Sequence, residues 1–86
     1  MLEARESINT FAVAMETKLR IKDDDLGTNG WLHDETSIEF LVDRLKEEVE
    51  ELLEVFNDCK PNSMKEECID VANFAMMIYD RINKRK

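Results

Sequence analysis

Two pairs of acidic residues have the spacing that a metal site built on helices requires. Glu48 and Glu51 are three positions apart, and so are Glu67 and Asp70. Residues at this spacing project from the same side of a helix, so each pair offers two carboxylates in one direction. Hard divalent cations prefer oxygen ligands, and Mg²⁺ binds a few carboxylates together with substrate phosphates. The four residues are therefore candidate ligands for Mg²⁺, for which Mn²⁺ could substitute.

The same acids are also compatible with a solvated helix face. Arg44 can pair with Glu48 at i,i+4, and Glu66 and Glu67 lie in a first turn, where the helix dipole favours acids. Asp70 lies beyond that turn, has poor helix propensity and gains nothing from the dipole. Spacing alone therefore leaves both interpretations open.

Apolar residues recur at helical spacing in three stretches. The predicted helices cover about residues 3–22, 37–57 and 63–84. We expect capping boxes at the second and third helix starts, in Thr36-Ser37-Ile38-Glu39 and Ser63-Met64-Lys65-Glu66, where a hydroxyl and a Glu satisfy free backbone N–H groups. Pro61 should stop anything that continues from the second helix. The short connection around Pro61 makes the second and third helices antiparallel neighbours.

The predicted fold is a single all-α domain over residues 1–86, an antiparallel bundle of about three helices completed by homo-oligomerisation. A chain of 86 residues buries only about 60% of its unfolded surface, so its own core is marginal. The third helix is also apolar on more than one side, through Phe74, Met76, Met77 and Ile78. A second copy would cover this surplus and give a homodimer or homotetramer. A wide stripe under two neighbouring helices is the alternative.

Composition argues against several classes of partner. The formal net charge is −8, with 20 acidic and 12 basic residues, which disfavours a nucleic-acid polymer or an anionic membrane surface. No apolar run reaches membrane-spanning length, and the N-terminus lacks the apolar core of a signal peptide. The two cysteines lack the partners of a zinc site. We expect a cytoplasmic protein.

The acidic segments resemble the signature of the MazG-type all-α nucleoside triphosphate pyrophosphatases. That signature is a Glu-Glu-x-x-Glu segment on one helix and a Glu-x-x-Asp segment on the next. This chain has Glu47-Glu48-Val49-Glu50-Glu51, then 15 intervening residues, then Glu67-Cys68-Ile69-Asp70. The stretch from Asp70 to Met77 also resembles the family's continuation of the third helix.

The resemblance implies a reaction and roles for the acids. Members of the family cleave a nucleoside triphosphate between the α- and β-phosphates, giving a nucleoside monophosphate and pyrophosphate. By resemblance, the residues that coordinate Mg²⁺ are Glu48, Glu51, Glu67 and Asp70. Glu47 would be the catalytic base that activates water, and the metal would polarise the phosphoryl oxygens.

Four further residues are candidates for substrate binding, and each also has a structural interpretation. Asn73, one turn past Asp70, could bond the substrate, or it could be a polar residue at a helix surface or oligomer seam. Arg81 and Lys84 are the candidates for the phosphates, although basic residues near a helix C-terminus also favour its dipole. Trp31, in the long connection before the second helix, could stack on a base or serve as an apolar anchor.

A non-enzymatic function is the alternative to the hydrolase. An acidic helical module that oligomerises, or that docks a basic helix, would explain the charge and the surplus apolar surface without a metal.

Overall fold

The structure is a computed structural model that describes residues 3–26 and 37–84. Over these ranges the chain forms three helices and no strand. They are α1 (Glu6–Leu26), α2 (Ile38–Asn57) and α3 (Pro61–Lys84). The predicted all-α class is confirmed, and the first helix begins and ends a few residues later than predicted.

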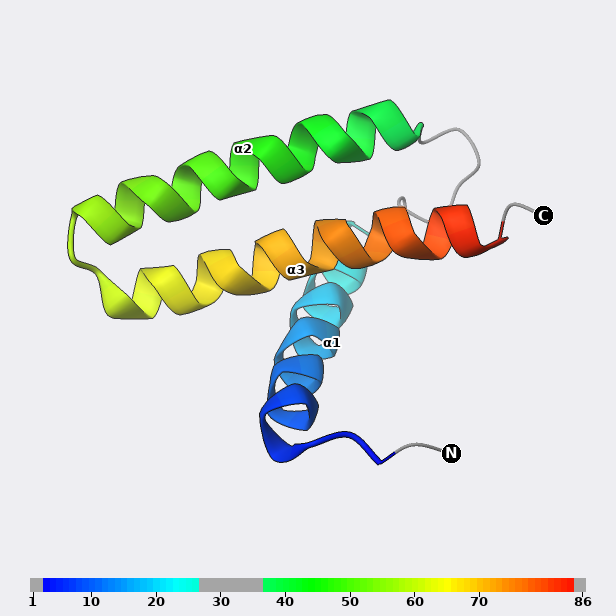
Figure 1. Ribbon diagram of the computed structural model, residues 1–86, viewed down its shortest axis with the longest axis horizontal. Helices are drawn as coiled ribbons and strands as arrows, with labels where there is room; N and C mark the ends of the chain where they lie inside the picture. The colour runs from blue at the N-terminus through cyan, green and yellow to red at the C-terminus, as the bar shows by residue number, and fades with distance from the viewer. Residues whose placement is uncertain (1–2, 27–36, 85–86) are drawn as a thin grey trace.

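Helix α3 is the central element of the fold (Figure 1). Helices α2 and α3 run antiparallel, side by side, and form the most extensive helix contact, as predicted. Helix α1 crosses α3 steeply and extends away from the hairpin, so it packs mainly on α3. Any site built from α2 and α3 is therefore approached by α1 from the α3 side.

Helix α2 is capped by Ser37. The Ser37 side chain accepts a hydrogen bond from the backbone N–H of Phe40 at 3.0 Å, as an N-cap does. The cap therefore lies one residue later than in the predicted box that paired Thr36 with Glu39. With Ser37 as the N-cap, the residue that would complete a capping box is Phe40, which has no carboxylate. The hydroxyl of the box is therefore present, but its Glu is missing.

The turn between α2 and α3 places Pro61 as the first residue of α3. The backbone N–H of Cys59 donates to the Phe56 carbonyl, and that of Lys60 donates to the Val55 carbonyl. These two bonds form a Schellman motif with Cys59 at the left-handed position, φ 57°.

Helix α3 begins earlier than predicted because proline is well suited to a first helical position, where its missing N–H costs nothing. Ser63 therefore lies inside the helix, and the predicted capping box at Ser63 is wrong. Helix α2 already ends at Asn57, ahead of Pro61, and the Schellman motif at Cys59 terminates it.

The apolar core of the described chain is small. Leu41 of α2 and Met77 of α3 are the buried hydrophobic residues within the described ranges. Many large apolar side chains remain exposed: Ile8, Phe11, Val13, Ile21, Phe40, Val42, Val49, Leu53, Phe56, Tyr79 and Ile82. Met77, which we expected in the surplus apolar surface, instead contributes to the core of the single chain.

None of the three described helices combines the length and the apolar composition needed to span a membrane.

Candidate metal centre

Three of the predicted ligands converge between α2 and α3. One carboxylate oxygen from each of Glu48, Glu67 and Asp70 lies within 4.8 Å of the other two. Glu48 comes from α2 and the other two from α3, so the antiparallel hairpin brings the two acidic segments together. Glu51 is not in this group and is exposed.

Glu48 lies in the interior of the hairpin, although it belongs to an acidic run. Its side chain is 5% exposed overall, and Oε1 accepts a hydrogen bond from Arg44 Nη2 at 2.9 Å. Burial, hydrogen bonds with Glu67 and Glu51, and the charges of Glu51 and Asp70 raise the pKa of Glu48 to about 7. Near neutral pH, this carboxyl therefore divides between its protonated and ionised forms when no metal is bound.

Two buried carboxylate oxygens have neither a hydrogen-bond donor nor an ion-pair partner among the described residues. They are Glu48 Oε2 and Glu67 Oε2. A proton retained on Glu48 supplies the hydrogen bond to Glu67, but full ionisation leaves both oxygens as acceptors that lack a donor. Unpaired buried acceptors are costly. A hard divalent cation would satisfy both oxygens at once, so the donor set fits Mg²⁺.

A lysine from α1 supplies the positive charge nearest to Asp70. Lys18 Nζ lies 2.7 Å from Asp70 Oδ1 and 3.3 Å from Glu66 Oε2. Burial lowers the pKa of Lys18, but hydrogen bonds and charge attraction to Asp70 and Glu66 outweigh it, so the net shift is upward. Lys22 Nζ is 3.9 Å from the same Asp70 oxygen. The ammonium of Lys18 therefore partly neutralises the cluster.

Arg44 holds the α2 side of the cluster. Its guanidinium forms ion pairs with both Glu47 and Glu48 and lies 5.1 Å from the centre of the Phe74 ring on α3. The cation–π contact and the two ion pairs orient Arg44 between the helices. The Arg44–Glu48 pair is the i,i+4 pair of the solvated-face interpretation, yet here its acid is buried.

The remaining predicted site residues lie at varying distances from the cluster. Glu47 is exposed and paired with Arg44. Asn73 is 4% exposed, and its Nδ2 donates to the Met15 carbonyl of α1 at 3.4 Å, while its Oδ1 has no partner among the described residues. Trp31 lies outside the described residues.

The two basic candidates on α3 are far along the helix from the acids. At 1.5 Å per residue, Arg81 lies about 16 Å and Lys84 about 21 Å beyond Asp70. Lys84 is paired with Asp80 at 3.0 Å. The structure thus brings Lys18 and Lys22 to the cluster rather than Arg81 and Lys84.

Sequence reasoning missed Lys18, Lys22 and the bridging position of Arg44. The contact between Lys18 and Glu66 spans 48 residues of sequence, so no local pattern identifies it. Lysines on an amphipathic helix are ordinarily solvated, and only the crossing of α1 over α3 distinguishes these two.

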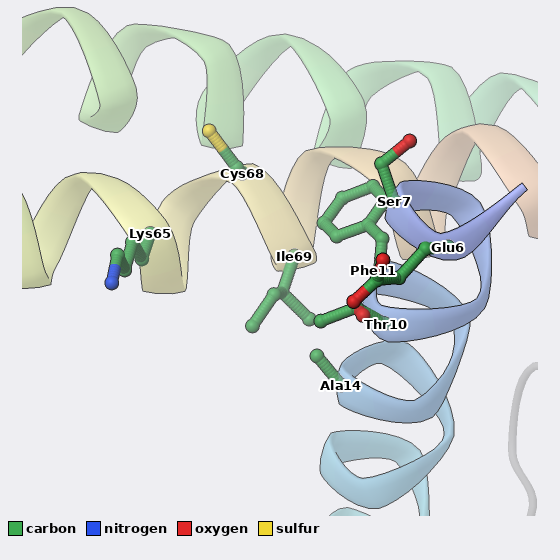
Figure 2. Close-up of a pocket in the computed structure, with 8 residues that line it drawn as sticks. All are labelled: Glu6, Ser7, Thr10, Phe11, Ala14, Lys65, Cys68 and Ile69. Carbon is green, nitrogen blue, oxygen red and sulfur yellow. The ribbon is translucent and has the colours of Figure 1, made fainter.

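Two grooves lie where α1 diverges from α3. One, of about 470 Å³, is lined beside the cluster by Thr17, Lys18, Lys22 and Glu66, together with Ala14, Ile21 and Ile69. The other is apolar, about 670 Å³, and Figure 2 shows Ile69 of α3 pointing towards Thr10 and Ala14 of α1. Phe11 contributes its ring to the same groove.

Comparison of the chain with protein-family models, with curated proteins and with solved structures found no match.

Proposed function

We propose that the chain is a Mg²⁺-dependent nucleoside triphosphate pyrophosphohydrolase that works as a homo-oligomer. The convergence of Glu48, Glu67 and Asp70 at the α2–α3 seam, with two buried carboxylate oxygens that lack a donor within the described part of the chain, is the observation that carries this proposal. The resemblance of the two acidic segments to the MazG-type signature supplies the reaction.

The three converging acids would hold the ion, with Glu51 at the edge of the site. Bound Mg²⁺ would polarise the phosphoryl oxygens and lower the pKa of an attacking water. Arg44 keeps Glu48 in position, and it also holds Glu47, the proposed base, next to the cluster. The release of Glu47 from Arg44 would free its carboxylate to accept a proton from water.

The phosphates would lie in the groove lined by Thr17 and Lys22. This groove adjoins Asp70 through the 3.9 Å contact of Lys22, so a phosphate there would be within reach of the cluster. Lys22 is half exposed, so its charge is available to solvent anions. Lys22 is thus a stronger phosphate candidate than Arg81 or Lys84, which lie several turns away.

The small core of the single chain supports homo-oligomerisation. Only two hydrophobic side chains of the described residues are buried, far fewer than an 86-residue domain needs. Exposed apolar residues lie on all three helices, and the apolar groove between α1 and α3 adds to them. A second copy presents the same surplus, so pairing would bury both.

Removal of single carboxylate charges tests the function. We expect Glu48→Gln, Glu67→Gln and Asp70→Asn each to lower Mg²⁺-dependent pyrophosphate release at least about tenfold, because each removes one ligand charge. Glu50→Gln and Glu54→Gln change exposed acids of α2 and serve as matched controls with near-normal rates. Equal rates across all five variants would refute the metal site.

The alternative function is a non-enzymatic acidic interaction module, which the exposed apolar residues favour independently of any metal. Thermal unfolding with and without Mg²⁺ or Mn²⁺ separates the two. An upward shift of Tm at millimolar metal, with pyrophosphate release from a panel of nucleotides, supports the hydrolase. No shift and no pyrophosphate release would support the module.

A further inference from the structure

We propose that Lys18 is an internal counter-ion of the carboxylate cluster, and that divalent metal binds by displacing its ammonium group from Asp70. The inference rests on the metal site of the proposed function and adds a regulatory step to it. Metal binding would then be an exchange of the ammonium group for the divalent ion, and this exchange would be coupled to the packing of α1 on α3.

The ammonium group of Lys18 supplies a positive charge to the cluster in the absence of a metal ion. Its Nζ is 2.7 Å from Asp70 Oδ1, on a residue whose side chain is 12% exposed. Two further acids of the cluster present buried oxygens without donors among the described residues, and one of them, Glu48, is 95% buried. The ammonium group thus lies against the very acid that completes the metal-binding group.

Charge and ligand availability make the two cations competitors. A divalent ion held by Asp70 and its neighbours would lie within a few ångströms of the ammonium, and like charges at such distances repel. The oxygen that faces Lys18 would also be shared between the ammonium and the ion. Metal binding is therefore favoured when the lysine side chain withdraws from Asp70.

Withdrawal of Lys18 also changes the attachment of α1. Ion pairs of Lys18 with Asp70 and Glu66, and of Lys22 with Asp70, join α1 to α3. The Asn73–Met15 hydrogen bond, at 3.4 Å, is long and contributes weakly. Loss of the Lys18–Asp70 pair would remove the shortest of these ion pairs, while Lys18–Glu66 and Lys22–Asp70 would remain, and the released amine would face the groove that it lines together with Lys22.

Calorimetric titration of the whole protein with Mg²⁺ or Mn²⁺, without nucleotide, tests the exchange. Lys18→Met keeps most of the side-chain volume and removes the competing charge. We expect it to lower the metal Kd about fivefold at low salt, the scale of a partly exposed ion pair. Arg20→Met is the matched control: it removes the same charge from α1, but Arg20 pairs with Glu16 of its own helix, so its Kd should stay near that of the unmodified chain.

Acetylation of lysines in the unmodified protein, read by mass spectrometry, gives a second test that does not depend on a variant folding. Lys18 should be protected without metal and should react faster when Mn²⁺ is added, whereas Lys46 and Lys65 should react equally in both states. Unchanged Lys18 reactivity at saturating metal would overturn the exchange.

The outcomes separate this inference from the proposed function. Equal metal Kd values for Lys18→Met and Arg20→Met, in a protein that hydrolyses nucleotides, would overturn the inference and leave the function standing. Tighter binding by Lys18→Met without hydrolysis by any form would support the inference and remove the function. The absence of metal binding in all forms would overturn both.

Discussion

Glu48 is the residue at which a metal site and a solvated acidic face differ most. A solvated face keeps its carboxylates in water, whereas Glu48 is buried and shares its environment with three other acids. Arg44 compensates only one of its oxygens. A buried carboxyl group among other acids is stabilised either by retaining its proton or by binding a cation. The raised pKa of Glu48 shows that, without a cation, the group tends to retain its proton.

The titration of Glu48 should make the metal-free protein less stable as pH rises. Its pKa is 4.5 in an unfolded chain and about 7 when folded. Between these values the folded state retains a proton that the unfolded state releases, so the free energy of unfolding falls with increasing pH. Urea unfolding from pH 5 to pH 8 measures this decline.

Variants and metal identify the group responsible. Glu48→Gln cannot ionise, so it should flatten the decline, and saturating Mg²⁺ should reduce it by stabilising the ionised form. Glu54→Gln, at an exposed position, should retain the slope of the unmodified protein. If the free energy of unfolding of Glu48→Gln falls with pH as steeply as that of the unmodified protein, the decline comes from the overall negative charge and not from Glu48.

The acidic members of the site were predictable, but their neutralising partners were not. Glu67 and Asp70 share one side of α3 through their spacing, and the short turn at Pro61 brings Glu48 opposite to them, so local rules suffice for this group. Lys18 reaches Asp70 only because α1 crosses α3, a tertiary packing choice that sequence spacing does not encode. Spacing also does not show that Glu51, one turn from Glu48, lies outside the converging group while its side chain still contacts Glu48.

At the scale of the helices, local signals located the elements but not their exact ends. Serine and proline both commonly mark helix boundaries, but Ser37 and Pro61 do so at positions other than those predicted. Ser37 is the N-cap of α2, although the predicted box began at Thr36. Pro61 both follows the end of α2 and begins α3, so the proposed start at Ser63 was two residues late. A residue such as Pro61 is compatible both with the end of one helix and with the start of the next. The backbone conformation of the turn decides which of the two it adopts.

The turn between α2 and α3 contains a strained position that can be relieved. Cys59 has φ 57°, a left-handed conformation that costs a residue with a Cβ more than it costs glycine. We expect Cys59→Gly to raise the free energy of unfolding by up to about 1 kcal/mol, because the gain exceeds the extra chain entropy of glycine. Chemical denaturation under reducing conditions measures it.

Cys59→Ala provides the control for the loss of the thiol. Alanine removes the sulfur but retains the Cβ, so it should give no comparable gain. A stability of Cys59→Gly at or below that of Cys59→Ala would show that the left-handed conformation is not a source of strain in this turn.

At the scale of the whole molecule, the exposed apolar surface predicts self-association. Tyr79 on α3 is 72% exposed, and Ile82 on the same helix is also exposed. We expect Tyr79→Glu and Ile82→Glu to lower the mass measured by light scattering, because a charge buried in an apolar seam is costly. Asn83→Glu adds the same charge at an exposed polar position and should leave the mass unchanged.

A monomeric mass for the unmodified protein at high concentration would contradict self-association. Met77→Glu is unsuitable for this test because Met77 is buried within the single chain, where a charge would disrupt the core. Sequence periodicity identified the surplus of apolar residues on the third helix, but it could not divide them between the core and the surface.

The central position of α3 has a consequence for folding during protein synthesis. Helices α2 and α3 are joined by a tight turn, so their contacts are close in sequence and can form quickly. Helix α1 leaves the ribosome first, but its main partner is the last of the three helices to be made. Until then Phe11 and its apolar neighbours on α1 lack their partner in the chain, so the nascent α1 presents its apolar side chains to solvent for longer than α2 does.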